Sequence, residues 1–128
     1  MAALEQFRIH TNAAAGDLDR ARAWYEEKLG LTPKEEDGGG LWYRFEGDTW
    51  LYVYETGSAG TARNTIAGWT VKDIEKVMDE LRGRGVEFED YDMPGIKTED
   101  GLATFETAKN AWFKDSEGNT FELSEPLG

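Results

Sequence analysis

His10 is the side chain in this 128-residue sequence best suited to move a proton near neutral pH. It is the only histidine, and imidazole is the side chain that changes its charge in that range. It stands in an alternating run, Q-F-R-I-H-T-N, which predicts a strand with His10, Arg8 and Asn12 on one face. His10 is therefore a candidate catalytic base, and the alternative is a hydrogen-bonded histidine with no catalytic duty.

Glu122 is the second candidate catalytic residue. It lies between Phe121 and Leu123, so in a strand its side chain faces away from both. If Phe121 and Leu123 pack beneath the helices, the Glu122 carboxylate faces a cavity, where its charge needs a partner. The alternative is a carboxylate on a solvent-facing edge.

Aromatic and basic side chains offer contacts for a ligand. Most of the aromatic rings are expected in the core, because large rings commonly fill the layer between sheet and helix. Arg8 and Arg44 could neutralise a bound carboxylate or phosphate, although surface ion pairs are favoured in so acidic a chain. The aromatic residues that crowd the strand-like segments are Trp42, Tyr43, Trp50, Tyr52, Tyr54, Trp69 and Trp112.

Other common catalytic motifs are missing from the sequence. The Gly38-Gly39-Gly40 run lacks the Lys-Ser/Thr of a phosphate-binding loop, and no Gly-x-Ser-x-Gly is present. The chain has no cysteine, which excludes a disulfide scaffold and a thiolate site.

The elements that must position these residues occur twice along the chain. Asp17 and Asp73 each precede a helical pattern, expected to end near Gly30 and near Gly83. Further strands lead to a repeated turn, Gly-Asp-Thr-Trp at 47–50 and Gly-Asn-Thr-Phe at 118–121. The sequence thus predicts two β-α-β-β-β modules, about 5–56 and 65–126, joined by a polar linker at 57–63. Two such halves enclose a cleft, where a binding site is expected.

The strands are predicted at 6–12, 34–36, 41–46, 49–55, 65–71, 86–91, 111–114 and 120–124. Residues 92–106 are predicted to be an irregular excursion, which is either a lid beside the cleft or a plain surface insertion.

Composition limits the partners. The formal charge of -12 disfavours nucleic acid and anionic membrane surfaces. No apolar run approaches the ~20 residues needed to span a bilayer. We expect a cytoplasmic protein.

The tandem modules, with D-L-x6-Y-x3-L-G in the first and A-W-F-K-D-S-E-G-N-T-F-E-L in the second, resemble the vicinal oxygen chelate superfamily. That superfamily contains glyoxalase I, extradiol dioxygenases, fosfomycin-resistance transferases and bleomycin-binding proteins. The resemblance implies an α+β fold over residues 1–128, a single glyoxalase-like domain. Its tandem β-α-β-β-β modules would form an open, curled-sheet barrel with the helices outside.

The resemblance also implies where a metal would bind. Metal-dependent members place ligands on the first and last strands of each half, which corresponds here to His10, seven residues before Asp17, and Glu122, seven beyond Asp115. The pair could hold a weak divalent metal (Zn, Ni, Mn or Fe) with waters. It could instead act as a metal-free acid–base or hydrogen-bonding pair, which we favour.

The other two implied ligand positions carry no donor. Aligning the turn glycines puts Leu51 opposite Glu122, and the counterpart of His10 is Ile66 or Ala67. Alkyl side chains cannot bind a divalent cation. By strand alternation Trp69 shares a face with Ala67, which makes Trp69 the candidate for stacking on a planar ligand.

Two functions follow as hypotheses. The first is a metal-free protein that binds a small organic ligand in the cleft, similar to the bleomycin-sequestering members. The second is a glyoxalase-like lyase or isomerase in which His10 and Glu122 hold a divalent metal; a remnant without ligand is a weaker third. A homodimer is expected, with or without exchanged halves. The candidate ligand-binding residues are Arg8, Asn12, Leu51, Ala67, Trp69 and Trp112.

Overall fold

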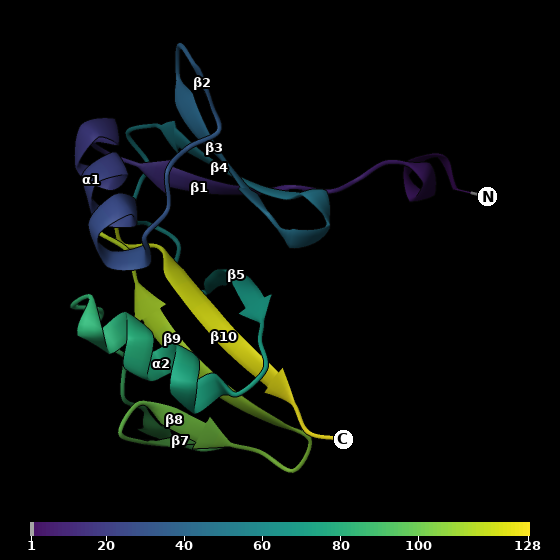
Figure 1. Ribbon diagram of the computed structural model, residues 1–128, viewed down its shortest axis with the longest axis vertical. Helices are drawn as coiled ribbons and strands as arrows, with labels where there is room; N and C mark the ends of the chain where they lie inside the picture. The colour runs from purple at the N-terminus through teal and green to yellow at the C-terminus, as the bar shows by residue number, and fades with distance from the viewer. Residues whose placement is uncertain (1) are drawn as a thin grey trace.

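The computed structural model describes residues 2–128, which form two sheets with one α-helix from each half of the chain (Figure 1). Met1, the first residue of the predicted 1–128 domain, lies outside the described residues. The predicted α+β class is confirmed: tandem β-α-β-β-β modules form curled sheets that do not close into a barrel.

The first module is a four-stranded sheet in the order β1-β4-β3-β2, in which β1 runs parallel to β4 and the other pairs are antiparallel. A short 3-10 turn (η1) precedes β1, and another (η2) joins β3 to β4. The bounds are η1 Ala3–Gln6, β1 Thr11–Ala15, α1 Leu18–Leu29, β2 Glu35–Asp37, β3 Gly40–Phe45, η2 Glu46–Asp48 and β4 Thr49–Glu55.

The second module repeats this order and extends it, as β5-β10-β9-β8-β7-β6, with β8 in the place that β2 holds in the first sheet. Its bounds are β5 Thr65–Thr70, α2 Ile74–Gly83, β6 Asp92–Met93, β7 Ile96–Glu99, β8 Leu102–Thr104, β9 Ala108–Lys114 and β10 Thr120–Pro126.

Two predictions for this module were wrong. Residues 92–106, predicted to be irregular, form the short strands β6 to β8. Asp100 and Gly101 both have positive φ, 51° and 80°, as a tight hairpin turn requires. Residues 86–91, predicted to be a strand, pair only through an isolated bridge between Phe88 and Phe113, and the Val86 N–H instead donates to the Leu81 carbonyl at the end of α2.

The two helices begin in different ways. Asp17 caps α1 as predicted, because its side chain accepts a hydrogen bond from the Arg20 N–H at 3.1 Å. Asp73 occupies the same position before α2 but has a left-handed backbone, with φ of 53°, and its side chain makes no capping bond. The Glu125 carboxylate of β10 accepts from the N–H groups of Asp73 and Ile74 instead, at 3.0 and 3.1 Å. The predicted Asp73 cap is therefore replaced by a carboxylate from a distant strand.

The two modules share one hydrophobic core. Tyr25 of α1 is fully buried; its ring stacks on Tyr43 of the first sheet at 5.3 Å and meets Phe121 of the second edge-on at 6.3 Å. Trp24 stacks on Phe113 of the second sheet at 6.3 Å. Both sheets therefore turn their helix-side faces toward the same core. The core also holds Ala13, Ala15, Ala21, Leu41, Leu51, Val53, Ile74, Met78, Val86, Ala111 and Leu123.

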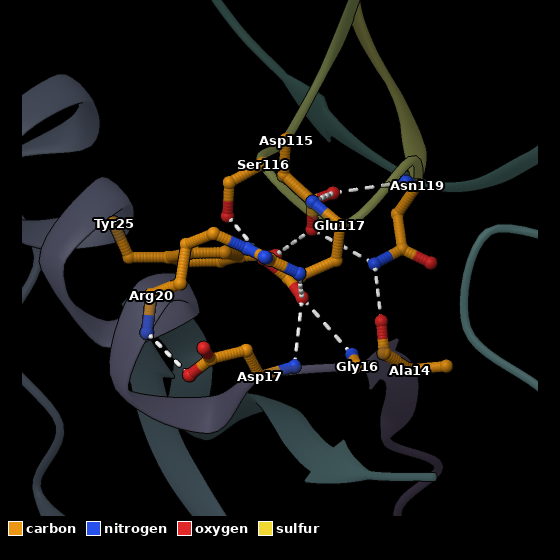
Figure 2. Close-up of polar contacts among 9 residues, drawn as sticks. All are labelled: Ala14, Gly16, Asp17, Arg20, Tyr25, Asp115, Ser116, Glu117 and Asn119. Carbon is orange, nitrogen blue, oxygen red and sulfur yellow. Dashed lines mark hydrogen bonds and ion pairs between the residues drawn. The ribbon is translucent and has the colours of Figure 1, made fainter. Parts of the chain in front are cut away.

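The loop between β9 and β10 ties the modules together through Asp115 (Figure 2). Asp115 Oδ2 accepts from the Tyr25 hydroxyl at 2.6 Å and from Asn119 Nδ2 at 2.8 Å. The same Asn119 amide donates to the Ala14 carbonyl at 2.9 Å. Burial, together with Asp115, raises the pKa of Tyr25 well above its usual value, so its hydroxyl remains a donor.

Glu117 of the same loop holds the start of α1 (Figure 2). Its side chain is completely buried, and its Oε1 accepts from the N–H groups of Gly16 and Asp17 at 2.9 and 3.0 Å. Arg20 donates from Nε and Nη2 at 2.8 and 2.9 Å, and Ser116 Oγ at 2.7 Å. These bonds, led by Arg20, lower the pKa of Glu117 to about 2 from an ordinary 4.5.

Glu117→Gln is expected to lower the free energy of unfolding at pH 7 by about 2 kcal/mol, because charge-assisted bonds to a buried group are lost. Since the folded pKa of Glu117 lies below its unfolded value, its contribution is present above pH 4.5 and lost as the pH falls toward 2. Urea unfolding between pH 7 and pH 3 should show a weaker pH dependence in the variant. The exposed Glu87→Gln is the matched control, and an equal effect of both substitutions would contradict the role of Glu117.

Candidate ligand-binding face

Four aromatic side chains lie on the face of the first sheet that points away from the core. Alternation along β3 and β4 sends Leu51 and Val53 inward, so the neighbouring rings emerge on the other side. We call this set the aromatic face; it consists of Trp42, Trp50, Tyr52 and Tyr54, all half-buried.

The rings of the aromatic face form a continuous stack. Trp42 and Tyr52 are cross-strand partners, and their ring centroids lie 4.3 Å apart with an interplanar angle of 28°. Tyr54 continues the stack at 5.9 Å from Tyr52, and Trp50 meets Trp42 edge-on at 6.1 Å. Such a row of rings offers both flat and edge contacts to a planar molecule.

Hydrogen bonds fix the orientation of these rings. Asp37 accepts from the Tyr52 hydroxyl at 2.9 Å and from Trp42 Nε1 at 3.4 Å. The Gly39 N–H and then the Tyr52 hydroxyl lower the pKa of Asp37, so its carboxylate stays charged and keeps accepting. Trp50 Nε1 donates to Asp48 at 3.0 Å. These hydrogen bonds therefore hold Trp42, Trp50 and Tyr52 in fixed orientations.

Gly40 lets the Tyr52 ring lie flat on the backbone of β3. A Cβ at this position would come within 2.4 Å of two carbon atoms of the Tyr52 ring, which no side chain tolerates. The neighbouring Gly39 has no such contact, since its nearest atom, the Tyr52 hydroxyl oxygen, would be 3.9 Å away.

His10 borders the aromatic face, one residue before β1 begins. Its ring is exposed and meets Trp42 edge-on at 5.1 Å. Arg8 lies beside it and pairs with Asp48, to which Arg44 also binds at 3.1 Å, so both arginines form the surface ion pairs that were favoured. A cavity of about 290 Å³ opens here, lined by Arg8, Ile9, His10, Glu35, Trp42 and Trp50.

Glu122 lies on the corresponding face of the second sheet. Phe121 and Leu123 are buried in the core, so the predicted alternation is confirmed and Glu122 points away from it. Its cross-strand partners are Trp112 on β9 and Gly68 on β5. The Glu122 side chain packs directly over Gly68, where an added Cβ would lie 3.3 Å from Cγ. Glu122 is not among the residues that line the cavity beside His10.

The other predicted ligand-binding residues are divided among different places. Leu51, Ala67 and Trp69 line a cavity of about 110 Å³ between the modules, which Trp50 of the aromatic face also lines. Asn12 is exposed on β1, opposite Tyr52. Trp112 is largely buried, with the Tyr91 ring edge-on at 5.5 Å. The structure brings together Arg8 and His10, and separately Leu51, Ala67 and Trp69.

Strand register corrects the sequence alignment of the two halves. Leu51 pairs with Tyr43 as Phe121 pairs with Phe113, so the first-half counterpart of Glu122 is Tyr52 and not Leu51. The two hairpins have equal length, but Gly47 and Gly118 occupy different positions in their turns. An alignment on these glycines is therefore out of register by one residue.

The pairing of the parallel strands likewise identifies the second-half counterpart of His10. Asn12 pairs with Tyr52 and Gly68 with Glu122, which makes Ile66 rather than Ala67 the counterpart of His10.

The residues present do not fit a complete metal site. The four implied ligand positions hold His10, Tyr52, Ile66 and Glu122, of which only His10 and Glu122 carry the nitrogen or carboxylate donors typical of divalent metals. Among residues 2–128, no group of three or more histidine, aspartate or glutamate side chains could hold a metal ion.

Sequence reasoning missed the aromatic face, because its rings were assigned to the core. The signal was present in Thr-Trp-Leu-Tyr-Val-Tyr-Glu at 49–55: if Leu51 and Val53 are buried, the aromatic residues between them must face outward.

Paired β-α-β-β-β modules that form two curled, open sheets are the arrangement of the glyoxalase-like class. The family model for the Glyoxalase/Bleomycin resistance protein/Dioxygenase superfamily matches residues 9–123, and the chain belongs to this superfamily. This is the vicinal oxygen chelate group that the sequence motifs resemble. No curated protein is a significant sequence match.

Solved structures share the fold at low sequence identity. A glyoxalase family protein from Bacillus anthracis is 22% identical, with a TM-score of 0.74 over 99% of this chain and 100% of that one. TnmS3, an antibiotic binding protein from Streptomyces sp. CB03234, is 20% identical, with a TM-score of 0.68 over 95% and 98%. The fosfomycin resistance protein FosX from Listeria monocytogenes is 17% identical, with a TM-score of 0.65 over 95% and 92%. At these identities the likeness concerns the fold.

Within residues 2–128, neither helix has the length and apolar character needed to cross a bilayer.

Gly40→Ala is expected to displace the Tyr52 ring and disorder the aromatic stack, because the new methyl group would overlap the ring. Near-ultraviolet circular dichroism should show a loss of the tyrosine and tryptophan signal, with a destabilisation of about 1–3 kcal/mol. Gly39→Ala is the matched control and should leave the spectrum unchanged. An unchanged spectrum for Gly40→Ala would contradict the described packing.

Proposed function

We propose that this chain is a small-molecule binding protein whose aromatic face holds a planar organic ligand, without the usual complete metal site. The observation that carries the proposal is the stacked Trp42–Tyr52 pair, half-exposed and fixed by hydrogen bonds to Asp37. Rings held in this way lose little conformational freedom when a ligand stacks on them. The antibiotic-binding relative with the same fold supports the proposal.

The cavity beside the stack sets what kind of contact the ligand can make. Its aromatic walls come from Trp42 and Trp50, while Arg8, His10 and Glu35 supply its polar groups. In this proposal the rings provide most of the binding free energy, and His10 orients the ligand through one hydrogen bond. Few well-placed polar groups among apolar walls are typical of small-molecule sites.

Trp42→Leu is expected to weaken binding of a planar probe by at least about tenfold, because a stacking surface is lost. Suitable probes are an anthraquinone and an acridine dye, titrated against tryptophan fluorescence and by calorimetry. Trp24→Leu is the matched control, since it removes a tryptophan ring of α1 that packs on Phe113, away from the aromatic face, and it should leave affinity unchanged. No saturable binding by the wild-type protein, or equal losses in both variants, would overturn the proposal.

Metal analysis tests the alternative, a glyoxalase-like lyase or isomerase that uses His10 and Glu122 with Zn, Ni, Mn or Fe. The purified protein, His10→Ala and Glu122→Ala are compared for bound metal. Stoichiometric metal that is lost in both variants would contradict the metal-free proposal. Weak, substoichiometric metal unaffected by either substitution would support it.

We also infer a homodimer in which two copies complete the ligand-binding cleft. The helix-side faces of both sheets share one core, so His10 and Glu122 both point away from it and the two modules of one chain do not enclose them together. The segment before β1 extends away from the rest of the molecule (Figure 1). It exposes Leu4, Phe7 and Ile9 by 80%, 67% and 92%. Exposed apolar groups on η1 and on the unpaired stretch between it and β1 suit contact with a second copy.

Ile9→Asp is expected to shift the protein from dimer to monomer, because a buried carboxylate would disfavour the contact between copies. Light scattering coupled to gel filtration measures the mass directly. Arg63→Asp, in the exposed linker, is the control for added charge and should remain dimeric. A monomeric wild-type protein would contradict the dimer while leaving ligand binding to the aromatic face to be judged by the titration.

A further inference from the structure

A second cavity, separate from the aromatic face, opens on the helix side of the sheets. Its volume is about 220 Å³, and it lies between the end of α1, the middle of α2 and strand β5. It shares no lining residue with the cavity beside His10. We propose that it is a binding site for a small, neutral, two-ring aromatic molecule.

The walls of this cavity come from both modules. Leu29 and Leu31 close the α1 side, while Val77 and Leu81, one helical turn apart, present the apolar face of α2. These four side chains are only half-buried, although the residues beneath them are packed into the core. A ligand would cover apolar surface that the chain itself leaves open to water.

The floor of the cavity is aromatic. The rings of Trp69 and Phe113 lie nearly parallel, 6.1 Å apart with an interplanar angle of 13°, and Leu123 lies beside them. A flat molecule entering between α1 and α2 can stack on the exposed part of the Trp69 ring.

The chemistry of the lining selects a neutral ligand. None of the lining residues is charged, and apart from Thr70 and Trp69 all of them have purely apolar side chains. A charged ligand would lose its hydration without gaining a charged partner, whereas a neutral arene with a single hydroxyl group gives up far less hydration.

The volume selects the size of the ligand. An apolar cavity of roughly 150 Å³ is sufficient to bind benzene. The present cavity, at about 220 Å³, is larger by a margin that suits a second fused ring. The ligand class is therefore a neutral fused bicyclic arene that carries at most one hydroxyl group.

The test uses 2-naphthol as probe and naphthalene-2-sulfonate as its charged analogue, with the full-length protein observed by methyl NMR. We expect saturable shifts of the Leu31, Val77 and Leu81 methyl groups with 2-naphthol, and affinity for the sulfonate at least about tenfold lower. Leu31→Trp fills the cavity and should weaken 2-naphthol binding by about tenfold or more. Leu102→Trp, at a half-buried leucine of β8 outside the cavity, is the matched control and should not.

Val77→Trp blocks the cavity from the opposite wall and serves if Leu31→Trp does not fold. Absence of methyl shifts, equal affinity for both probes, or retained binding in a folded blocking variant would overturn the proposal. So would shifts that depend on protein concentration alone, which would show that a second copy fills the cavity. The binding proposed for the aromatic face is tested independently, because it depends on Trp42 and not on these methyl groups.

Discussion

The two carboxylates of the β9–β10 loop hold the structure together. Asp115 and Glu117 come from the second module, and their buried oxygens accept hydrogen bonds from Tyr25, Arg20 and the backbone at the start of α1. Each charge is matched by several donors, which is the condition under which a buried carboxylate is tolerated. Because α1 is fixed in this way, its Tyr25 ring reaches both sheets and the modules share one core. The outward orientation of the aromatic face follows from that shared core.

The fold was predictable because its signals are local and repeated. Asp17 marks the beginning of α1 and Gly30 its end, and the turns of the two hairpins are indicated by Gly47 and Gly118. The start of α2 was not predictable in detail, since its cap, Glu125, lies 51 residues beyond Ile74. The strands β6 to β8 were missed because a run with few apolar residues gives a weak strand signal, even where its Asp-Gly turn is favourable.

The candidate site was predictable only in part. Motif spacing identifies His10 and Glu122, and alternation places them correctly on the faces opposite the core. The sequence alignment did not reveal that Tyr52 is the first-half counterpart of Glu122. The alignment matched the turn glycines, and these do not report which residues of the paired strands lie opposite each other. A shift of one residue moves a side chain to the other face of a sheet, so Leu51 and Trp69 were assigned to the wrong side of the molecule relative to Glu122. Register is set by pairing between strands, which single-strand patterns do not contain.

The carboxylates that reach the helix starts from a distance have a consequence for the order in which the structure is completed. Glu117 accepts from the N–H groups of Gly16 and Asp17, just before α1, and Glu125 accepts from those of Asp73 and Ile74 at the start of α2. Both carboxylates follow the two helices in the sequence, and both belong to the hairpin of β9 and β10. Because this one hairpin serves both helix starts, neither module has all of its native hydrogen bonds until β9 and β10 have formed.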